Sequence, residues 1–184
     1  MTDQGGADTP DQWFPLRQSR TRAILRPVLA GSQALPQTLT GGCRCGATRY
    51  TLALDAMPPI YCCHCLDCQS WSGSAFSEQA LIREDAITVT GPVVDYRITN
   101  ASGAESHQWL CGVCHARIYN TNSARPGIAV VRAGTLDASD TVTPRTHIWV
   151  KRKQPWVTIA DDVPTFAENA PPAEFIAIMM RARA

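Results

Sequence analysis

The arrangement of the cysteines constrains this chain more than any other feature of its sequence. Seven of the eight cysteines fall into three short groups, which are Cys43-x-Cys45, Cys63-x-Cys65-x2-Cys68 and Cys111-x2-Cys114. Thiols spaced this closely bind a metal ion, form disulfides or serve as reactive groups. The compartment and the way in which the groups combine decide between these uses.

The sequence favours the cytosol and metal binding. The first residues lack the basic and apolar regions of a secretory signal, and no apolar run approaches the ~20 residues that cross a bilayer. In the cytosol clustered thiols are metal ligands or reactive groups more often than disulfides. The spacing matches neither of the common ferredoxin runs, so iron–sulfur binding is not favoured. A net charge of +1 gives no bulk electrostatic case for nucleic-acid or acidic-membrane partners.

Two of the groups together predict one closed structural zinc site. Cys111 and Cys114 have the spacing of a zinc knuckle, in which Gly112 assists the turn. Cys43 and Cys45 are separated by one residue, so in an extended chain both side chains lie on one face. Four cysteines fill a tetrahedral coordination sphere and leave no position for a substrate. We expect this site to contribute directly to folding.

The remaining group predicts a second zinc ion with an open position. Cys63 and Cys65 share a face, and we expect a turn through Leu66 and Asp67 to bring Cys68 beside them. Three thiolates on a divalent ion leave a centre with a net charge of −1, which generates hydroxide poorly. Such a centre suits the binding and activation of an exogenous thiol. We therefore predict that Cys63, Cys65 and Cys68 are both ligands and catalytic residues.

Two neighbouring residues offer ways to close this second site. Cys62 would complete a four-thiolate sphere, and His64 would complete a sphere of three thiolates and one imidazole. Strand alternation turns both side chains away from the face that Cys63 and Cys65 share, which favours the open site. The closed forms remain alternatives at the level of the sequence.

The fold expected from residue 38 onward is all-β. Short β-rich runs are separated by Gly, Pro, Asn and Asp, a pattern typical of a sandwich or of small stacked antiparallel sheets. The main runs are 48–54, 60–63, 86–90, 93–99, 106–110, 117–120, 128–133 and 146–150. Residues 173–183 predict a short C-terminal helix. We expect an N-terminal extension over 1–37, a zinc-binding β domain over 38–170 and the helix within 171–184.

These motifs, in this order, resemble the glutathione-dependent formaldehyde-activating enzyme family, which also includes centromere protein V. The resemblance covers about residues 39–166 and rests on residues 41–46, the second cysteine group, residues 72–76 and the knuckle at Cys111. The similarity continues through residues 134–137, residues 147–150 and Pro155-Trp156. It implies an all-β fold stapled by a structural zinc, and the same division of the seven cysteines between two ions.

The resemblance also implies a reaction. The family joins glutathione to formaldehyde as S-hydroxymethylglutathione, which is a carbon–sulfur lyase reaction in reverse. The expected partner is therefore a small thiol such as glutathione, or its aldehyde adduct. A non-enzymatic zinc-stapled β module that binds a partner protein or a small thiol is the alternative. A nucleic-acid reader built on zinc knuckles is least favoured, because the chain has no strong basic bias.

The chain departs from the family pattern at two places. His115 follows the knuckle where the family often has glycine, so we expect a different local turn. Gln69-Ser70 stands where a more basic pair is often found, which weakens the case for an anionic ligand there. Lys151-Arg152-Lys153 could attract carboxylates, although a solvated charge cluster is commoner. Trp71 and Phe76 are candidates for a pocket wall, with core packing as the simpler interpretation.

Overall fold

The computed structural model describes residues 38–100 and 102–181, which form ten strands, two α-helices and four 3-10 turns within these ranges. The sequence-based expectation for residues 1–37 lies outside the described residues. Within the described ranges, no helix is long and apolar enough to cross a membrane.

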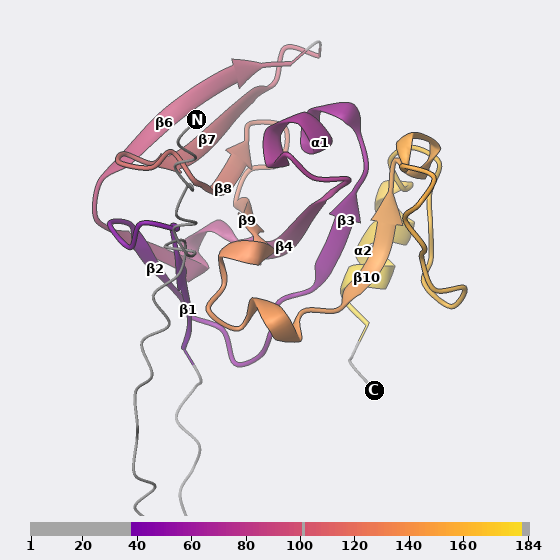
Figure 1. Ribbon diagram of the computed structural model, residues 1–184, viewed down its shortest axis with the longest axis horizontal. Helices are drawn as coiled ribbons and strands as arrows, with labels where there is room; N and C mark the ends of the chain where they lie inside the picture. Colours follow the sequence, from indigo (N-terminus) through magenta and orange to yellow (C-terminus); the bar gives the residue numbers. More distant parts are fainter. Residues whose placement is uncertain (1–37, 101, 182–184) are drawn as a thin grey trace, which may run out of the picture. The chain divides into compact units, whose positions relative to one another are not determined.

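The strands form two sheets (Figure 1). The smaller is antiparallel, in the order β1 (Leu39–Gly42), β2 (Arg49–Leu52) and β5 (Ile87–Thr90). The larger has the order β10 (Pro144–Ile148), β3 (Ile60–Cys63), β4 (Ser77–Arg83), β9 (Ile128–Arg132), β8 (Arg117–Asn122), β7 (Glu105–Cys111) and β6 (Val93–Thr99). The predicted all-β fold is confirmed. One pair, β10 with β3, is parallel. These strands are far apart in sequence, so no tight hairpin forces them to run antiparallel.

Alternation along the strands gives the small sheet one apolar face, while the large sheet is buried on both faces near its centre. In β2, Tyr50 and Leu52 are buried while Arg49 and Thr51 are exposed. Side chains of both sheets meet in one core, which contains Tyr50 and Leu52 from the small sheet and Ile60, Ala80, Ile82, Ala129 and Val131 from the large one. The core therefore holds the β1–β2 loop close to the large sheet.

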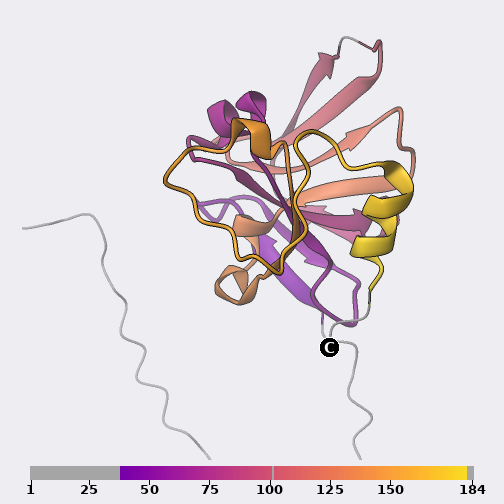
Figure 2. The same cartoon turned by 90° about the vertical axis from the view of Figure 1, so that its right-hand side faces the viewer.

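The opposite face of the large sheet carries a second core. Tyr61, Cys63, Val130 and Ile148 pack there with Met179 of α2 (Pro172–Met179). Figures 1 and 2 show α2 beside β10, and the Phe175 ring meets Tyr61 edge-on at a centroid distance of 5.2 Å. The predicted C-terminal helix is therefore present and covers this face.

The shorter elements complete the chain. Helix α1 (Leu66–Ser72) follows β3, and it ends at Gly73, which adopts the left-handed conformation with a φ of 63°. The 3-10 turns are η1 (Glu84–Ala86), η2 (Ala133–Thr135), η3 (Ser139–Thr141) and η4 (Val150–Arg152). The sequence predicted only a turn after Cys65. The structure extends that turn into α1, so Cys68 lies on a helix.

Candidate metal centres and the adjoining cavity

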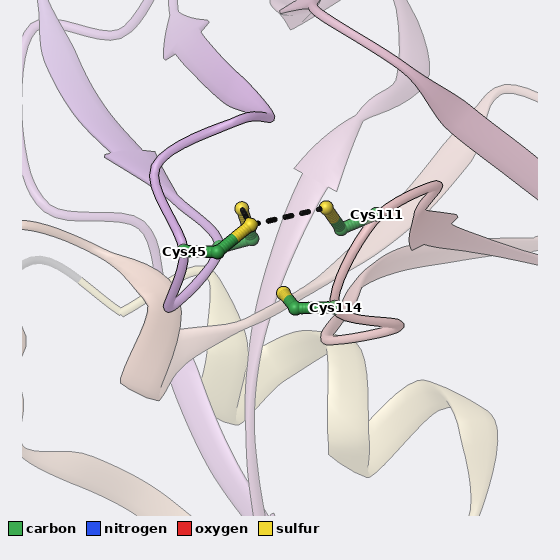
Figure 3. Close-up of side chains that lie close together, drawn as sticks. Cys45, Cys111 and Cys114 are labelled. Carbon is green, nitrogen blue, oxygen red and sulfur yellow. Dashed lines mark hydrogen bonds between the residues drawn. The ribbon is translucent and has the colours of Figure 1, made fainter.

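Four cysteines from two distant segments come together at the first centre. Figure 3 shows three of them, Cys45, Cys111 and Cys114. Cys43 and Cys45 lie in the loop after β1, Cys111 ends β7 and Cys114 lies in the following turn. The four sulfurs lie within 4.8 Å of one another, with Cys43–Cys45 at 3.4 Å and Cys45–Cys111 at 3.8 Å. Zinc–sulfur bonds of about 2.3 Å place tetrahedral sulfurs about 3.8 Å apart. The donor set therefore fits a tetrahedral thiophilic metal ion.

Backbone N–H groups prepare two of these sulfurs, those of Cys43 and Cys111, to carry negative charge. The Thr48 N–H donates to Cys43 Sγ at 3.2 Å, and the Val113 N–H donates to Cys111 Sγ at 3.4 Å. The pKa of Cys111 is lowered to about 5, first by the backbone N–H of Cys114 and then by Thr48. Because a metal binds the thiolate rather than the thiol, these hydrogen bonds favour the form that binds.

The turn that closes the knuckle is made by a residue other than glycine. His115 has a φ of 56°, in the left-handed region, and its N–H donates to the Cys111 carbonyl at 3.0 Å. Gly112 does not have a positive φ, although a Cβ there would lie 3.1 Å from Pro92 Cβ. His115 therefore makes this turn in the strained left-handed conformation, which glycine adopts more readily. Whether the turn differs from that of family members with glycine at this place stays a prediction.

Three cysteines form the second centre. Cys63 ends β3, Cys65 is the N-cap of α1 and Cys68 lies in the first turn of that helix. Their sulfurs lie within 4.8 Å of one another. Cys65 Sγ accepts the Cys68 N–H at 3.4 Å. The neighbouring side chains of Cys63 and Cys68, together with the backbone N–H groups of Cys68 and Asp67, hold the pKa of Cys65 well below its usual range.

Cys62 and His64 do not join this group among the described residues. Cys62 is fully buried and pairs in register with Glu78 of β4. Burial, and then the Glu78 carboxyl, raises the pKa of Cys62 to about 12, which keeps it a neutral thiol. His64 is also buried, and its Nε2 lies 2.9 Å from Nδ1 of His147 on β10. Cys62 therefore lies beside Glu78, and His64 lies beside His147, rather than with the three sulfurs.

A cavity of about 700 Å³ opens beside Cys65 and Cys68. Trp71, Gln108 and Arg117 line it with them. A second cavity of about 620 Å³ also has Trp71 and Arg117 in its wall, together with Phe76, Glu78, His115 and Arg132 among others. Trp71 and Phe76 therefore line cavities. The sequence had left a pocket wall and core packing as the two interpretations for these residues. The three-cysteine group is thus accessible from one side.

Comparison with known families places the chain. Residues 38–152 match the family model described as glutathione-dependent formaldehyde-activating enzyme. The chain belongs to this family. The family resemblance predicted from the cysteine groups is therefore confirmed, over slightly fewer residues at the C-terminal end than the sequence motifs suggested.

Two other comparisons add little to the family assignment. The structure is similar to the crystal structure of a Rhodobacter sphaeroides protein, a structural-genomics target, with a TM-score of 0.44 and 20% sequence identity. The match covers 58% of this chain and 92% of that one. A comparison with curated proteins found no match.

The structure also brings polar residues near the second cysteine group that the sequence motifs did not indicate. Gln79 of β4 donates from Nε2 to Cys68 Sγ at 3.3 Å. Arg117 and Arg132 reach the cavities from β8 and β9. The available signal was an arginine at one end of each of these two strands. In contrast, Lys151, from the basic run considered above, pairs with Glu168.

Proposed function

We propose that this family member is a zinc-dependent carbon–sulfur lyase that acts on the adduct of a thiol with an aldehyde. The observation that carries the proposal is the three-cysteine group, in which three sulfurs converge without a fourth Cys, His, Asp or Glu ligand among the described residues. Two of these cysteines line a cavity of about 700 Å³. A three-ligand set with an accessible side is typical of a catalytic rather than a structural metal site.

The four-cysteine group has the opposite character and is proposed as a structural site. Its ligands come from the β1–β2 loop and from the turn after β7, so an ion there would tie the small sheet to the large one. Four thiolates complete a tetrahedral sphere. We therefore assign Cys43, Cys45, Cys111 and Cys114 to folding and Cys63, Cys65 and Cys68 to the reaction.

The reaction needs a deprotonated thiol and an aldehyde held together. Zinc bound by the three cysteines would supply a Lewis-acidic position at which a thiol is deprotonated at neutral pH. In the synthetic direction the substrate sulfur bonds to the carbonyl carbon, and the carbonyl π electrons move to oxygen, which takes a proton. In the lyase direction the hydroxyl group loses its proton, the carbonyl double bond re-forms, and the carbon–sulfur bond breaks with its electron pair leaving on sulfur. The cavity wall contributes by holding both reactants in reach of one another.

The test measures exchange between glutathione, formaldehyde and S-hydroxymethylglutathione with the zinc-loaded chain. We expect exchange faster than in the absence of protein, and its loss in Cys68→Ser. Cys62→Ala is the matched control, since Cys62 belongs to neither sulfur group, and it should retain exchange. Wild-type protein that binds zinc at both sites but neither binds a thiol nor accelerates exchange would contradict the proposal and favour a non-enzymatic β module.

A further inference from the structure

Two arginines line the cavities beside the three-cysteine group. Arg117 begins β8 and Arg132 ends β9, and these strands are antiparallel neighbours, so the two residues lie at the same end of the pair. Arg117 lines both cavities, including the one that Cys65 and Cys68 line. Arg132 lines the 620 Å³ cavity and is only 8% exposed.

Neither arginine has a carboxylate partner among the described residues. Arg117 donates from Nε to Gln108 Oε1 at 2.7 Å, and its guanidinium carbon lies 4.0 Å from the centroid of the Trp71 ring. Arg132 donates from Nη2 to Asn120 Oδ1, while its Nε and Nη1 are buried with no hydrogen-bond partner. Glu78 lines the same cavity, yet it forms no ion pair with either residue.

Such an arrangement is electrostatically incomplete. Buried cations cost free energy unless they are paired or hydrogen-bonded. Burial, and then the charge of Arg132, lowers the pKa of Arg117 to about 9. The two guanidinium groups therefore disfavour one another, and the sulfurs of Cys65 and Cys68 offset this only in part. Guanidinium groups that line a cavity without a carboxylate partner are suited to bind an anionic group of a ligand.

The second metal centre would balance the charge of these arginines but not their hydrogen bonds. Three thiolates on a divalent ion would carry a net −1, and a bound substrate thiolate would make it −2, against +2 for the two arginines. The buried Nε and Nη1 of Arg132 have no acceptor among the described residues. Arg117, like Trp71, lines both cavities, so an acceptor bound by Arg117 would lie within reach of a ligand whose sulfur is at Cys65 and Cys68.

We propose that Arg117 and Arg132 recognise a carboxylate of the thiol substrate, so that the enzyme selects thiols that carry a carboxylate. This inference rests on the proposed function, because it assumes that a thiol binds at the three-cysteine group. Arg117 would contact the carboxylate, and Arg132 would add charge from behind it. Positive charge thus comes from β8 and β9, although the sequence lacks the basic pair that the family often has after Cys68.

The experiment compares two thiols that differ only in charge. Full-length protein is loaded with cobalt(II), and the thiolate-to-cobalt charge-transfer absorption is titrated with 3-mercaptopropionate and with 3-mercaptopropionamide. We expect wild-type protein to bind the carboxylate thiol about tenfold more tightly, as a charge-assisted hydrogen bond allows. Arg117→Gln should reduce this preference to about twofold or less while binding of the amide changes little.

Two further variants distinguish loss of charge in the cavity from loss of charge elsewhere and from misfolding. Arg83→Gln removes an exposed arginine that pairs with Asp85, and it should keep the full preference. Arg132→Lys retains the buried charge and should keep part of the preference, with folding checked by circular dichroism. Equal binding of the two thiols to wild type, or equal losses for both in Arg117→Gln, would overturn the inference but leave the proposed function intact. Binding of neither thiol would overturn both.

Discussion

Gln79 donates its side-chain amide to Cys68 Sγ at 3.3 Å, which links the centre of β4 to the helical cysteine of the second group. The Gln79 side chain is itself held, because its Oε1 accepts the Tyr61 hydroxyl at 2.6 Å. A group that orients a metal ligand commonly changes metal affinity by about 10-fold to 100-fold. Tyr61 and Gln79 therefore position a candidate ligand without being ligands.

Gln79→Leu tests this link. The substitution removes the amide donor to Cys68 but keeps a side chain of similar size at a buried position. We expect zinc affinity at the three-cysteine group to fall at least about tenfold, as measured by competition with a chromophoric chelator. The four-cysteine group serves as the internal control, and its affinity should not change. An unchanged affinity at both sites would show that Cys68 is oriented without Gln79.

Tyr61→Phe tests the hydrogen bond between the Tyr61 hydroxyl and Gln79 Oε1. Burial raises the pKa of Tyr61 to about 12, so its hydroxyl stays protonated at neutral pH and donates to Gln79. Loss of this buried hydrogen bond should lower the free energy of unfolding by about 1 kcal/mol in denaturant titrations. Tyr119→Phe is the control, because the Tyr119 hydroxyl forms no hydrogen bond with a described residue while its ring stacks on Trp109. Equal losses for the two variants would contradict the account.

The knuckle turn gives a prediction in the stabilising direction. His115 has a φ of 56°, and a residue with a Cβ in this conformation costs roughly 1 kcal/mol relative to glycine. His115→Gly should therefore raise the free energy of unfolding of the zinc-loaded protein by up to about 1 kcal/mol. Ala116→Gly, next in the chain and without a positive φ, should lower it by about 0.5 kcal/mol or more. A loss of stability in both variants would argue against strain at His115.

An ion pair between the small sheet and the segment that joins η2 to η3 predicts a pH-dependent effect. Asp137 accepts from Arg49 of β2 and from the Thr40 hydroxyl of β1 at 2.6 Å. Arg49 first, and then Thr40, lowers the pKa of Asp137 in the folded protein. The unfolded chain then binds the carboxyl proton more readily. The stabilisation is present above the unfolded pKa of about 3.9, and it is lost as the pH falls through the lowered folded value.

Asp137→Asn measures that contribution. Both partners are about half exposed, so solvent screens the pair and the loss at pH 7 should stay below about 1 kcal/mol. The difference from wild type should shrink in high salt and vanish in acid. Asp85→Asn, which breaks a pair between residues two positions apart, should have the smaller effect. A loss that persists unchanged below the carboxyl pKa would contradict an ionic origin.

The sequence predicted the cysteine groups and the β fold because both depend on local spacing. Cys63 and Cys65 are separated by one residue, and Cys43 and Cys45 likewise, so strand alternation alone brings each pair to one side. The sequence did not predict α1. Seven residues that include Asp, Gln and two Ser have weak helix propensity, and here Cys65 caps the helix and Gly73 ends it.

The polar surroundings of the second group could not be found from the sequence. Gln79, Arg117 and Arg132 come from three strands of the large sheet, and only the pairing register brings them near Cys68. An arginine at the end of an apolar strand predicts an exposed strand end. Burial of Arg132 results from how β9 lies between β4 and β8, which is a property of the sheet order rather than of local pattern.

The division of the seven cysteines between two unlike metal sites is the central claim, and zinc stoichiometry tests it most directly. Wild-type protein and the variants Cys68→Ser and Cys62→Ala are each purified with zinc, dialysed against a weak chelator and analysed for zinc per chain. We predict two ions in wild type and in Cys62→Ala, but only the structural ion in Cys68→Ser. Two ions held at full affinity by Cys68→Ser would contradict the assignment of Cys63, Cys65 and Cys68 to an open zinc site.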